Sequence, residues 1–416
     1  MTTGDAEKYR DLQKVLDITR SMAATVDLGS LLESIIERSI ELLDAERASL
    51  FLYEPGTNEL VSRIATDVDE IRFPADRGIA GETIRKGLTI SIPDAYADER
   101  FNPDIDRKTG FHTRNILSVP LRDYQGELVG VLQVLNKRQD SFSDYDVSLA
   151  ETLGAQAGVA LQRARLIEHY VRKQEMERAM QIARDIQRGL LPHGPPSIEG
   201  FDIAGFSEPA DDTGGDTYDF LALGDGRWLL AVADASGHGI GPALVIAQTR
   251  AMLRAIGLQG SDVPAVLQTT NDLLCRDLEG RFVTCFLGML DPAAGGLTYA
   301  SAGHGPLLFY SRQGDEFSEW SATGLPLGIM AETDFEKVVI ERFAPGDFFV
   351  ITTDGFFEAA NPDGELFGIP RMTGQLRRDR DLSGEQMIYN LRTAVSDFTQ
   401  GRPQADDLTA VVIRRK

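Results

Sequence analysis

The stretch Trp228–Leu244 reads WLLAVADASGHGIGPAL. An apolar run ends in the carboxylate of Asp234 and a glycine-rich turn follows, which predicts a buried strand, a tight turn and a helix from Gly241 to about Ile256. The pattern recurs where FFVITT leads into Asp354 and Gly355. Strands that end in carboxylates indicate either a shared cation site or ordinary aspartate–glycine turns.

Two further acidic motifs flank strand-like runs. GGDTYD supplies Asp216 and Asp219, and Asp406 and Asp407 precede LTAVVIR. Gathered carboxylates would repel one another and take up protons, whereas bound divalent ions remove that cost. No His or Cys pair has zinc-like spacing, so the oxygen ligands favour Mg²⁺ or Mn²⁺. Two such ions about 3.5–4 Å apart can lower the pKa of a bridging water and direct it at phosphorus.

Composition predicts a protein of the reducing cytoplasm. The chain has 416 residues, of which 42% are hydrophobic and 25% charged, as in ordinary globular domains. A formal net charge of −22 disfavours nucleic acid and anionic membranes as partners. No apolar run is long enough to span a bilayer, and the two cysteines, Cys275 and Cys285, cannot form a disulfide framework.

Hydrophobic periodicity divides the chain into domains. Residues 7–24 and Leu28–Leu43 have helical spacing, and short strand-like runs follow to about residue 165. From about Ala155 to Leu191 a heptad-like pattern predicts one long helix, which packs on its own copy in a homodimer or on a neighbouring domain. The predicted organisation is an N-terminal helix (1–24), a mixed α/β sensor domain (25–165), a connecting helix (166–191) and a second domain (192–416).

Six motifs of the second domain resemble the PPM metal-dependent phosphatases of the SpoIIE/RsbU branch. In chain order they are GGDTYD, ADASGHGIGPAL, SAGHGPLLFY, GLPLGI, PGDFFVITTDGFFEAANPDGELFG and ADDLTAVVI. The preceding segment ARDIQRGLLP is also similar to that branch, so the resemblance covers about residues 180–416. It implies an α/β sandwich of two central sheets flanked by helices, and a serine/threonine phosphatase activity.

The same resemblance implies a dinuclear Mn²⁺ or Mg²⁺ centre. Its implied ligands, of which the four aspartates are also the implied catalytic residues, are Asp216, Asp234, Ala235, Asp354 and Asp406. Asp234 would bridge the two ions, and Ala235 would contribute its backbone carbonyl. Asp407 stands where the family has Asp or Asn and is interpreted as a supporting residue of the metal site. His238 and His304 either act as a general acid or shape their turns by hydrogen bonding, and we favour the second role.

The N-terminal half contains a candidate ligand pocket. Gly78 and Gly81 flank a helix start with free backbone N–H groups, and Asp106, Thr109 and Thr113 have spacings that could place them on one helical face. These features predict either a pocket for a small ligand with a flat base and a phosphate, or an ordinary capped helix.

This region resembles a GAF domain of the cyclic-nucleotide-binding kind. The family's NKFDE motif is present as Asn136, Lys137, Phe142 and Asp146, with Val147 in place of the final Glu. The implied pocket residues are Ser49, Ile79, Ala80, Asp106, Thr109, Thr113 and Gln133. The resemblance implies cyclic AMP or cyclic GMP as a regulatory ligand; another small ligand or a purely dimerising GAF domain is the alternative.

The sequence thus predicts a phosphatase that acts on a phosphoprotein. In the SpoIIE/RsbU branch the substrate is usually a small anti-sigma-factor antagonist. Ligand binding to the sensor would change activity about tenfold through the connecting helix. The alternative is a non-enzymatic, nucleotide-sensing dimer that docks signalling partners. A nucleotide cyclase or phosphodiesterase lacks support in the C-terminal half.

Overall fold

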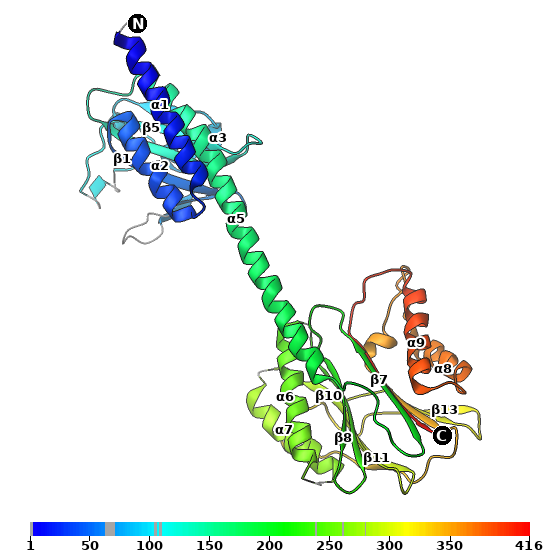
Figure 1. Cartoon of the computed structure of the whole chain (residues 1–416). Helices are drawn as coiled ribbons and strands as arrows, with labels where there is room; N and C mark the ends of the chain where they lie inside the picture. Colours follow the sequence, from blue (N-terminus) through cyan, green and yellow to red (C-terminus); the bar gives the residue numbers. More distant parts are fainter. Residues whose placement is uncertain are drawn as a thin grey trace. The chain divides into compact units, whose positions relative to one another are not determined.

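The computed structural model describes residues 3–62, 71–103, 106–107, 110–237, 239–259, 262–278 and 280–416. The chain forms two compact units, Met1–Glu175 and Met176–Lys416 (Figure 1). Within the described ranges, no helix has both the length and the apolar content that crossing a membrane requires.

The first unit is built on a six-stranded antiparallel sheet with the order β3-β2-β1-β6-β5-β4. Its strands are β1 (Ala45–Glu54), β2 (Glu59–Ser62), β3 (Ile71–Pro74), β4 (Ile90–Ile92), β5 (Ile116–Arg122) and β6 (Leu128–Lys137). The predicted strands of this unit match β1, β2, β5 and β6; the last residues predicted for the second of them lie outside the described ranges.

Helices cover both faces of this sheet. The helices α1 (Thr3–Ala24), α2 (Leu28–Leu43) and the first part of α5 (Asp144–Leu190) share one apolar core with alternate residues of β1, β5 and β6. Side chains of opposite parity, including Phe51 and Tyr53 of β1, pack with α3 (Gly78–Lys86) on the other face. The two-residue period of the strands therefore places apolar side chains in both layers.

The long helix α5 begins earlier than the predicted start near Ala155. Ser143 caps it: the backbone N–H of Ser143 donates to Asp146 Oδ2 at 2.8 Å, and the backbone N–H of Asp146 donates to Ser143 Oγ at 3.3 Å. This reciprocal pair is a capping box in which Asp replaces the usual Glu. The apolar heptad pattern alone does not reveal it.

The second unit contains two five-stranded sheets that lie face to face (Figure 1). The first has the order β14-β11-β10-β9-β8, formed by β8 (Asp216–Ala222), β9 (Trp228–Ala235), β10 (Val283–Asp291), β11 (Gly296–Ala302) and β14 (Val338–Ile340). The second has the order β13-β12-β15-β16-β7, formed by β7 (Phe201–Glu208), β12 (Leu307–Ser311), β13 (Glu316–Trp320), β15 (Phe348–Thr352) and β16 (Leu408–Arg415).

Three apolar layers hold this sandwich together. Aromatic side chains fill the layer between the sheets, where Phe286 and Tyr299 of one sheet contact Phe349 of the other. The helices α6 (Ile240–Gly257) and α7 (Val263–Asp277) pack on the outer face of the first sheet. The helices α8 (Gly368–Arg378) and α9 (Gly384–Thr399) pack on the second. The predicted α/β sandwich is confirmed.

Candidate metal centre

The aspartates singled out in the sequence lie at adjoining strand ends of the two sheets. Asp216 and Asp234 are opposite residues of the antiparallel pair β8–β9. In the other sheet, Asp354 follows β15 and Asp406 precedes β16, which pairs with β15. Thr353 connects the two sheets, because its Oγ1 donates to Asp216 Oδ2 at 2.7 Å and accepts the backbone N–H of Thr409 at 3.1 Å.

Burial and mutual repulsion raise the pKa values of these carboxyl groups. Burial, with the charges of Asp234 and Asp407, raises the pKa of Asp216 well above its usual value. Burial, followed by the charges of Asp354 and Asp406, raises the pKa of Asp234 to about 7. The pKa of Asp354 is also raised, first by burial and then by Asp406. These are the conditions under which carboxylates favour a bound cation over a shared proton.

The oxygen atoms of these aspartates are chemically suited to hard divalent ions, although the side chains do not converge on one point. In the described part of the chain, no three His, Cys, Asp or Glu side chains already converge as the shell of one ion would require. Asp216 is buried, whereas Asp406 is exposed and Asp354 is partly exposed. The two more exposed side chains therefore have room to change rotamer.

Asp407 organises the loop that carries Asp216. Its Oδ1 accepts the backbone N–H of Ala210 at 2.7 Å, and its Oδ2 accepts those of Gly215 at 2.6 Å and Asp216 at 3.3 Å. A Cβ on Gly214 would overlap Asp407 Oδ2, so this approach requires glycine. The motif that contains Asp407 does not by itself distinguish these backbone contacts from direct metal ligation.

The backbone of Ala235 lies against the same loop. Its N–H donates to Gly215 O at 2.9 Å, and a Cβ on Gly215 would lie 2.7 Å from Ala235 O. The carbonyl expected to serve as a ligand is thus next to the residue that precedes Asp216.

His304 is a core residue behind the cluster. Its Nδ1 lies 2.9 Å from Thr284 Oγ1, and Thr284 is the cross-strand partner of Asp234. Ser301 Oγ donates to the carbonyl oxygen of His304 at 2.6 Å. Burial lowers the pKa of His304 to about 4, so the ring is neutral at neutral pH and cannot donate a proton as an imidazolium. His238 lies outside the described residues.

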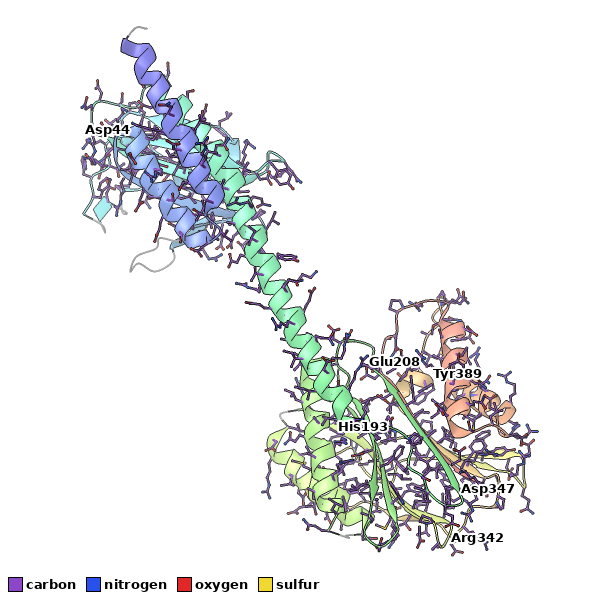
Figure 2. The ribbon with its side chains drawn as sticks, viewed as in Figure 1. Asp44, His193, Glu208, Arg342, Asp347 and Tyr389 are labelled. Atoms are coloured by element: carbon purple, nitrogen blue, oxygen red, sulfur yellow. The ribbon has the colours of Figure 1, made fainter. Side chains whose placement is uncertain are left out.

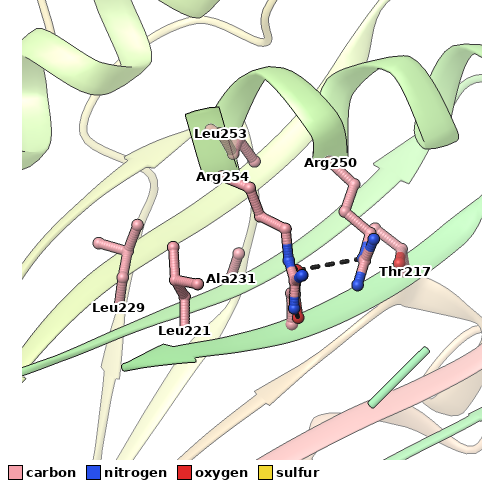
Figure 3. Close-up of a pocket in the computed structure, with 8 residues that line it drawn as sticks. Thr217, Leu221, Leu229, Ala231, Arg250, Leu253 and Arg254 are labelled. Carbon is pink, nitrogen blue, oxygen red and sulfur yellow. Dashed lines mark hydrogen bonds and ion pairs between the residues drawn. The ribbon is translucent and has the colours of Figure 1, made fainter. Parts of the chain in front are cut away.

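Asp219, the second acid of GGDTYD, joins β8 to α6 rather than facing the other aspartates. It is 5% exposed, and its carboxylate pairs with Arg254, whose Nη2 donates to Oδ1 at 2.9 Å, and with Arg250, whose Nε lies 3.1 Å from Oδ2. Figure 3 shows both arginines extending from α6 to the strand. This ion triad was not predicted, because the two arginines lie more than thirty positions from Asp219 in the chain.

In the first unit, four of the expected pocket residues lie on α3 or on the neighbouring strands: Ser49, Ile79, Ala80 and Gln133. Ser49, Gln133 and Ser118 are successive cross-strand neighbours on β1, β6 and β5. Thr83 Oγ1 of α3 donates to Ser118 Oγ at 2.7 Å, and Gln133 Nε2 donates to the same oxygen at 3.4 Å. Ile79 and Ala80 are buried on α3 in two apolar clusters.

Two other expected pocket residues, Asp106 and Thr113, bond to each other. Asp106 accepts the backbone N–H and the Oγ1 of Thr113 at 2.7 and 2.8 Å, and the hydroxyl of Tyr96 at 3.1 Å. Thr113 lies in the irregular segment before β5, so the predicted common helical face is wrong; Thr109 lies outside the described residues. Two residues of the NKFDE motif form an ion pair, with 2.6 Å between Lys137 Nζ and Asp146 Oδ1.

Comparisons with known proteins agree with both units. Residues 27–161 match the GAF domain model, and residues 224–416 match the model of stage II sporulation protein E (SpoIIE). The phosphoserine phosphatase RsbU of Bacillus subtilis is 29% identical over 280 residues, which cover 67% of this chain and 81% of RsbU.

Two further matches concern the halves separately. The SiaA-PP2C domain of Pseudomonas aeruginosa has a TM-score of 0.51 and 24% identity, covering 59% of this chain and 98% of that domain, which shows the phosphatase fold. The probable 3',5'-cyclic phosphodiesterase pde-5 of Caenorhabditis elegans is 33% identical over 187 residues, covering 41% of this chain but only 26% of that protein. The chain therefore carries a GAF domain in its N-terminal half, followed by a C-terminal domain that matches the SpoIIE family and is similar to the phosphatase RsbU.

Proposed function

We propose that the chain hydrolyses phosphoserine or phosphothreonine on a protein, using water activated at a pair of Mn²⁺ or Mg²⁺ ions. The observation that carries this proposal is geometric: Asp216 and Asp234 are opposite residues of β8 and β9, and Thr353, next to Asp354 in the other sheet, donates to Asp216 Oδ2 at 2.7 Å. Such an arrangement is unfavourable without cations and suited to two hard ions with oxygen ligands.

Each residue would have a distinct task. Asp216 and Asp234 would hold the ions from β8 and β9. The carbonyl of Ala235 and the carboxylates of Asp354 and Asp406 would complete the ligands. When bound, the ions lower the pKa of water and stabilise charge on the phosphoryl oxygens. Thr353 would keep Asp216 in place through its 2.7 Å hydrogen bond.

For the substrate, we propose a small signalling phosphoprotein of the anti-sigma-factor-antagonist class. The similarity to RsbU over two thirds of the chain supports a phosphoprotein substrate. For the GAF domain, we propose a small regulatory ligand of the cyclic AMP or cyclic GMP class. The resemblance of the domain and the similarity to a cyclic-nucleotide phosphodiesterase support it, with Ser49, Thr83 and Gln133 as candidate contacts.

We also propose that α5 pairs with the same helix of a second chain. Apolar side chains that belong to its heptad-like pattern are exposed in the single chain, among them Val171 at 47%, Ile182 at 55% and Ile186 at 63%. A helix that displays apolar side chains at heptad-like spacing is suited to a coiled-coil partner. In a second copy of the chain, α5 presents the same apolar face.

A phosphate-release assay tests the activity. The full chain, with Mn²⁺ or Mg²⁺, should release phosphate from a phosphoserine peptide, and a chelator should abolish release. Asp354→Asn should lower turnover at least about a hundredfold, whereas Asp363→Asn, in an exposed turn, should leave it unchanged. Wild-type turnover in Asp354→Asn would remove Asp354 from the mechanism.

The same assay tests the regulation. After removal of co-purified ligand, saturating cyclic AMP or cyclic GMP should change turnover about tenfold. Calorimetry without heat for either nucleotide, together with equal turnover, would reject the cyclic-nucleotide proposal while leaving the phosphatase proposal intact.

A further inference from the structure

The C-terminal end of α5 makes hydrogen bonds to the loop that leads into Asp216. This loop follows Glu208, the last residue of β7, which is labelled in Figure 2. The side-chain amide of Gln187 makes two bonds to the backbone of a single residue: Gly214 N–H donates to Gln187 Oε1 at 3.0 Å, and Gln187 Nε2 donates to Gly214 O at 2.5 Å. The amide thus pairs with the loop as a neighbouring strand would.

A second side chain of the same helix also contacts this loop. One turn before Gln187, the Nε of Arg184 donates to the carbonyl oxygen of Asp212 at 3.0 Å, and its guanidinium forms an ion pair with the Asp212 carboxylate. Side chains three residues apart lie on one face of a helix. The end of α5 therefore presents a continuous polar edge to this loop.

Gly214 lies between α5 and the aspartate cluster. On its other side, Asp407 accepts the N–H groups of Gly215 and Asp216. Gly214 and Gly215 have no side chains of their own to fix their conformation, and glycine has the largest backbone freedom of any residue. Gln187 on one side and Asp407 on the other therefore supply the constraints that the two glycines lack.

We propose that Gln187 is a positioning residue for the metal centre: its two bonds hold the Gly214–Gly215 backbone in the conformation that presents Asp216 to the ions. This role rests on the proposed metal-dependent function. A loop already ordered before binding loses less conformational entropy when the ion binds. The affinity for the ion therefore depends on the two hydrogen bonds between Gln187 and Gly214. Gln187 is neutral, and its effect is therefore geometric rather than electrostatic.

Two substitutions and one matched control separate these effects. Gln187→Met keeps the side-chain volume and removes both bonds. Gln187→Glu keeps an acceptor for Gly214 N–H, but it sets a carboxylate oxygen against Gly214 O and adds negative charge. Gln181→Met is the control, because Gln181 is exposed on the same helix and bonds to Asp185 within it, at 2.9 Å.

The experiment measures Mn²⁺ binding to the full chain by calorimetry, hydrogen exchange of the metal-free protein, and phosphate release as a function of Mn²⁺ concentration. Gln187→Met should weaken Mn²⁺ binding about tenfold and speed exchange at the Gly214 and Gly215 amides. Near-normal turnover should return at saturating Mn²⁺. Gln187→Glu should also weaken binding; tighter binding would mean that charge rather than position controls the site.

The outcomes separate the positioning role from the activity. Mn²⁺ affinity and loop exchange in Gln187→Met equal to those of Gln181→Met would overturn the positioning role and leave the phosphatase proposal standing. If the wild type binds Mn²⁺ but releases no phosphate from phosphopeptides, while Gln187→Met still binds Mn²⁺ more weakly, the activity fails and the positioning role holds. A wild type that binds neither Mn²⁺ nor Mg²⁺ overturns both.

Discussion

Asp216 and Asp234 lie directly opposite each other on β8 and β9, and their carboxyl groups are close enough to share a hydrogen bond. Two carboxylates cannot make such a bond unless one of them keeps a proton. Since burial and repulsion raise the pKa of both groups, the metal-free protein carries protons here that a bound cation would replace.

This pair predicts an unusual pH dependence of stability. An unfolded aspartate titrates near 3.8, whereas Asp234 in the folded chain titrates at about 7. Between these pH values the folded state holds more protons than the unfolded state, so the free energy of unfolding of the metal-free protein falls as pH rises. We expect its melting temperature to be about 5 °C lower at pH 7.5 than at pH 5, and saturating Mn²⁺ to remove much of that difference.

Asp234→Asn is the control for this measurement, because an amide has no proton to release. Its melting temperature without metal should vary less with pH than that of the wild type, and Mn²⁺ should stabilise it less. A wild-type profile that is flat or rises from pH 5 to 7.5 without metal would contradict the assigned direction of the Asp234 pKa shift.

Gly355 sets the distance between two of the proposed ligands. A Cβ at this position would overlap the carbonyl oxygen of Asp407 and lie 3.3 Å from that of Asp406. Gly355→Ala should therefore push the Asp354 turn away from Asp406, destabilise the fold by about 1–3 kcal/mol and reduce turnover at least about tenfold. Chemical unfolding and phosphate release measure the two effects.

Gly374→Ala provides the matched comparison. Gly374 lies inside α8, and an added Cβ would meet nothing within 4 Å. Alanine should stabilise this helix by about 0.5–1 kcal/mol and leave turnover unchanged. Equal behaviour of the two variants would show that Gly355 does not limit the geometry of the site.

The sandwich and its candidate ligands were implied by a family resemblance, and that resemblance is carried by contiguous motifs. The strand, carboxylate and turn of WLLAVADASGHG are contiguous, and the same holds for FFVITTDG. The supporting contacts were not predictable in the same way: Gln187 meets Gly214, and Thr353 meets Asp216, across 27 and 137 positions of the chain. Nothing in the local residue pattern marks such pairs, because the fold alone creates them. Similarly, the spacing of Asp106 and Thr113 suggested a common helical face. In the structure the two side chains are hydrogen-bonded, but Thr113 lies in an irregular segment rather than in a helix.

The Asp219 triad predicts a large penalty for losing one charge. Asp219→Asn would leave Arg250 and Arg254 with no carboxylate; the side chain of Arg250 is only 12% exposed. Breaking a buried ion pair from one side typically costs about 3–5 kcal/mol, so chemical unfolding should show a loss of that order. Because the triad connects α6 to the strand that begins with Asp216, Mn²⁺ affinity should fall as well.

Asp225→Asn tests whether burial is the cause. Asp225 pairs with Arg227 in an exposed turn, with 2.5 Å between Arg227 Nη2 and Asp225 Oδ2. Exposed ion pairs contribute about 0–1 kcal/mol, so this variant should keep wild-type stability and Mn²⁺ affinity. A similar loss of stability in both variants would mean that the Asp219 triad has no special role.

The exposed apolar face of α5 predicts a homodimer that a charge can dissociate. Ile182 and Ile186, one turn apart, would pack against the copy in a coiled coil, and burying a glutamate there is unfavourable. Light scattering on the full chain should give a dimer mass for the wild type and a monomer mass for the Ile182→Glu/Ile186→Glu double variant. Lys173→Glu, which the helical period places on the opposite face, should remain dimeric. Since every proposed metal ligand comes from one chain, the monomer should keep its basal phosphate release while losing the response to a GAF ligand. A monomeric wild type would refute the pairing of α5, and loss of basal turnover in the monomeric variant would show that the partner chain supports the active site.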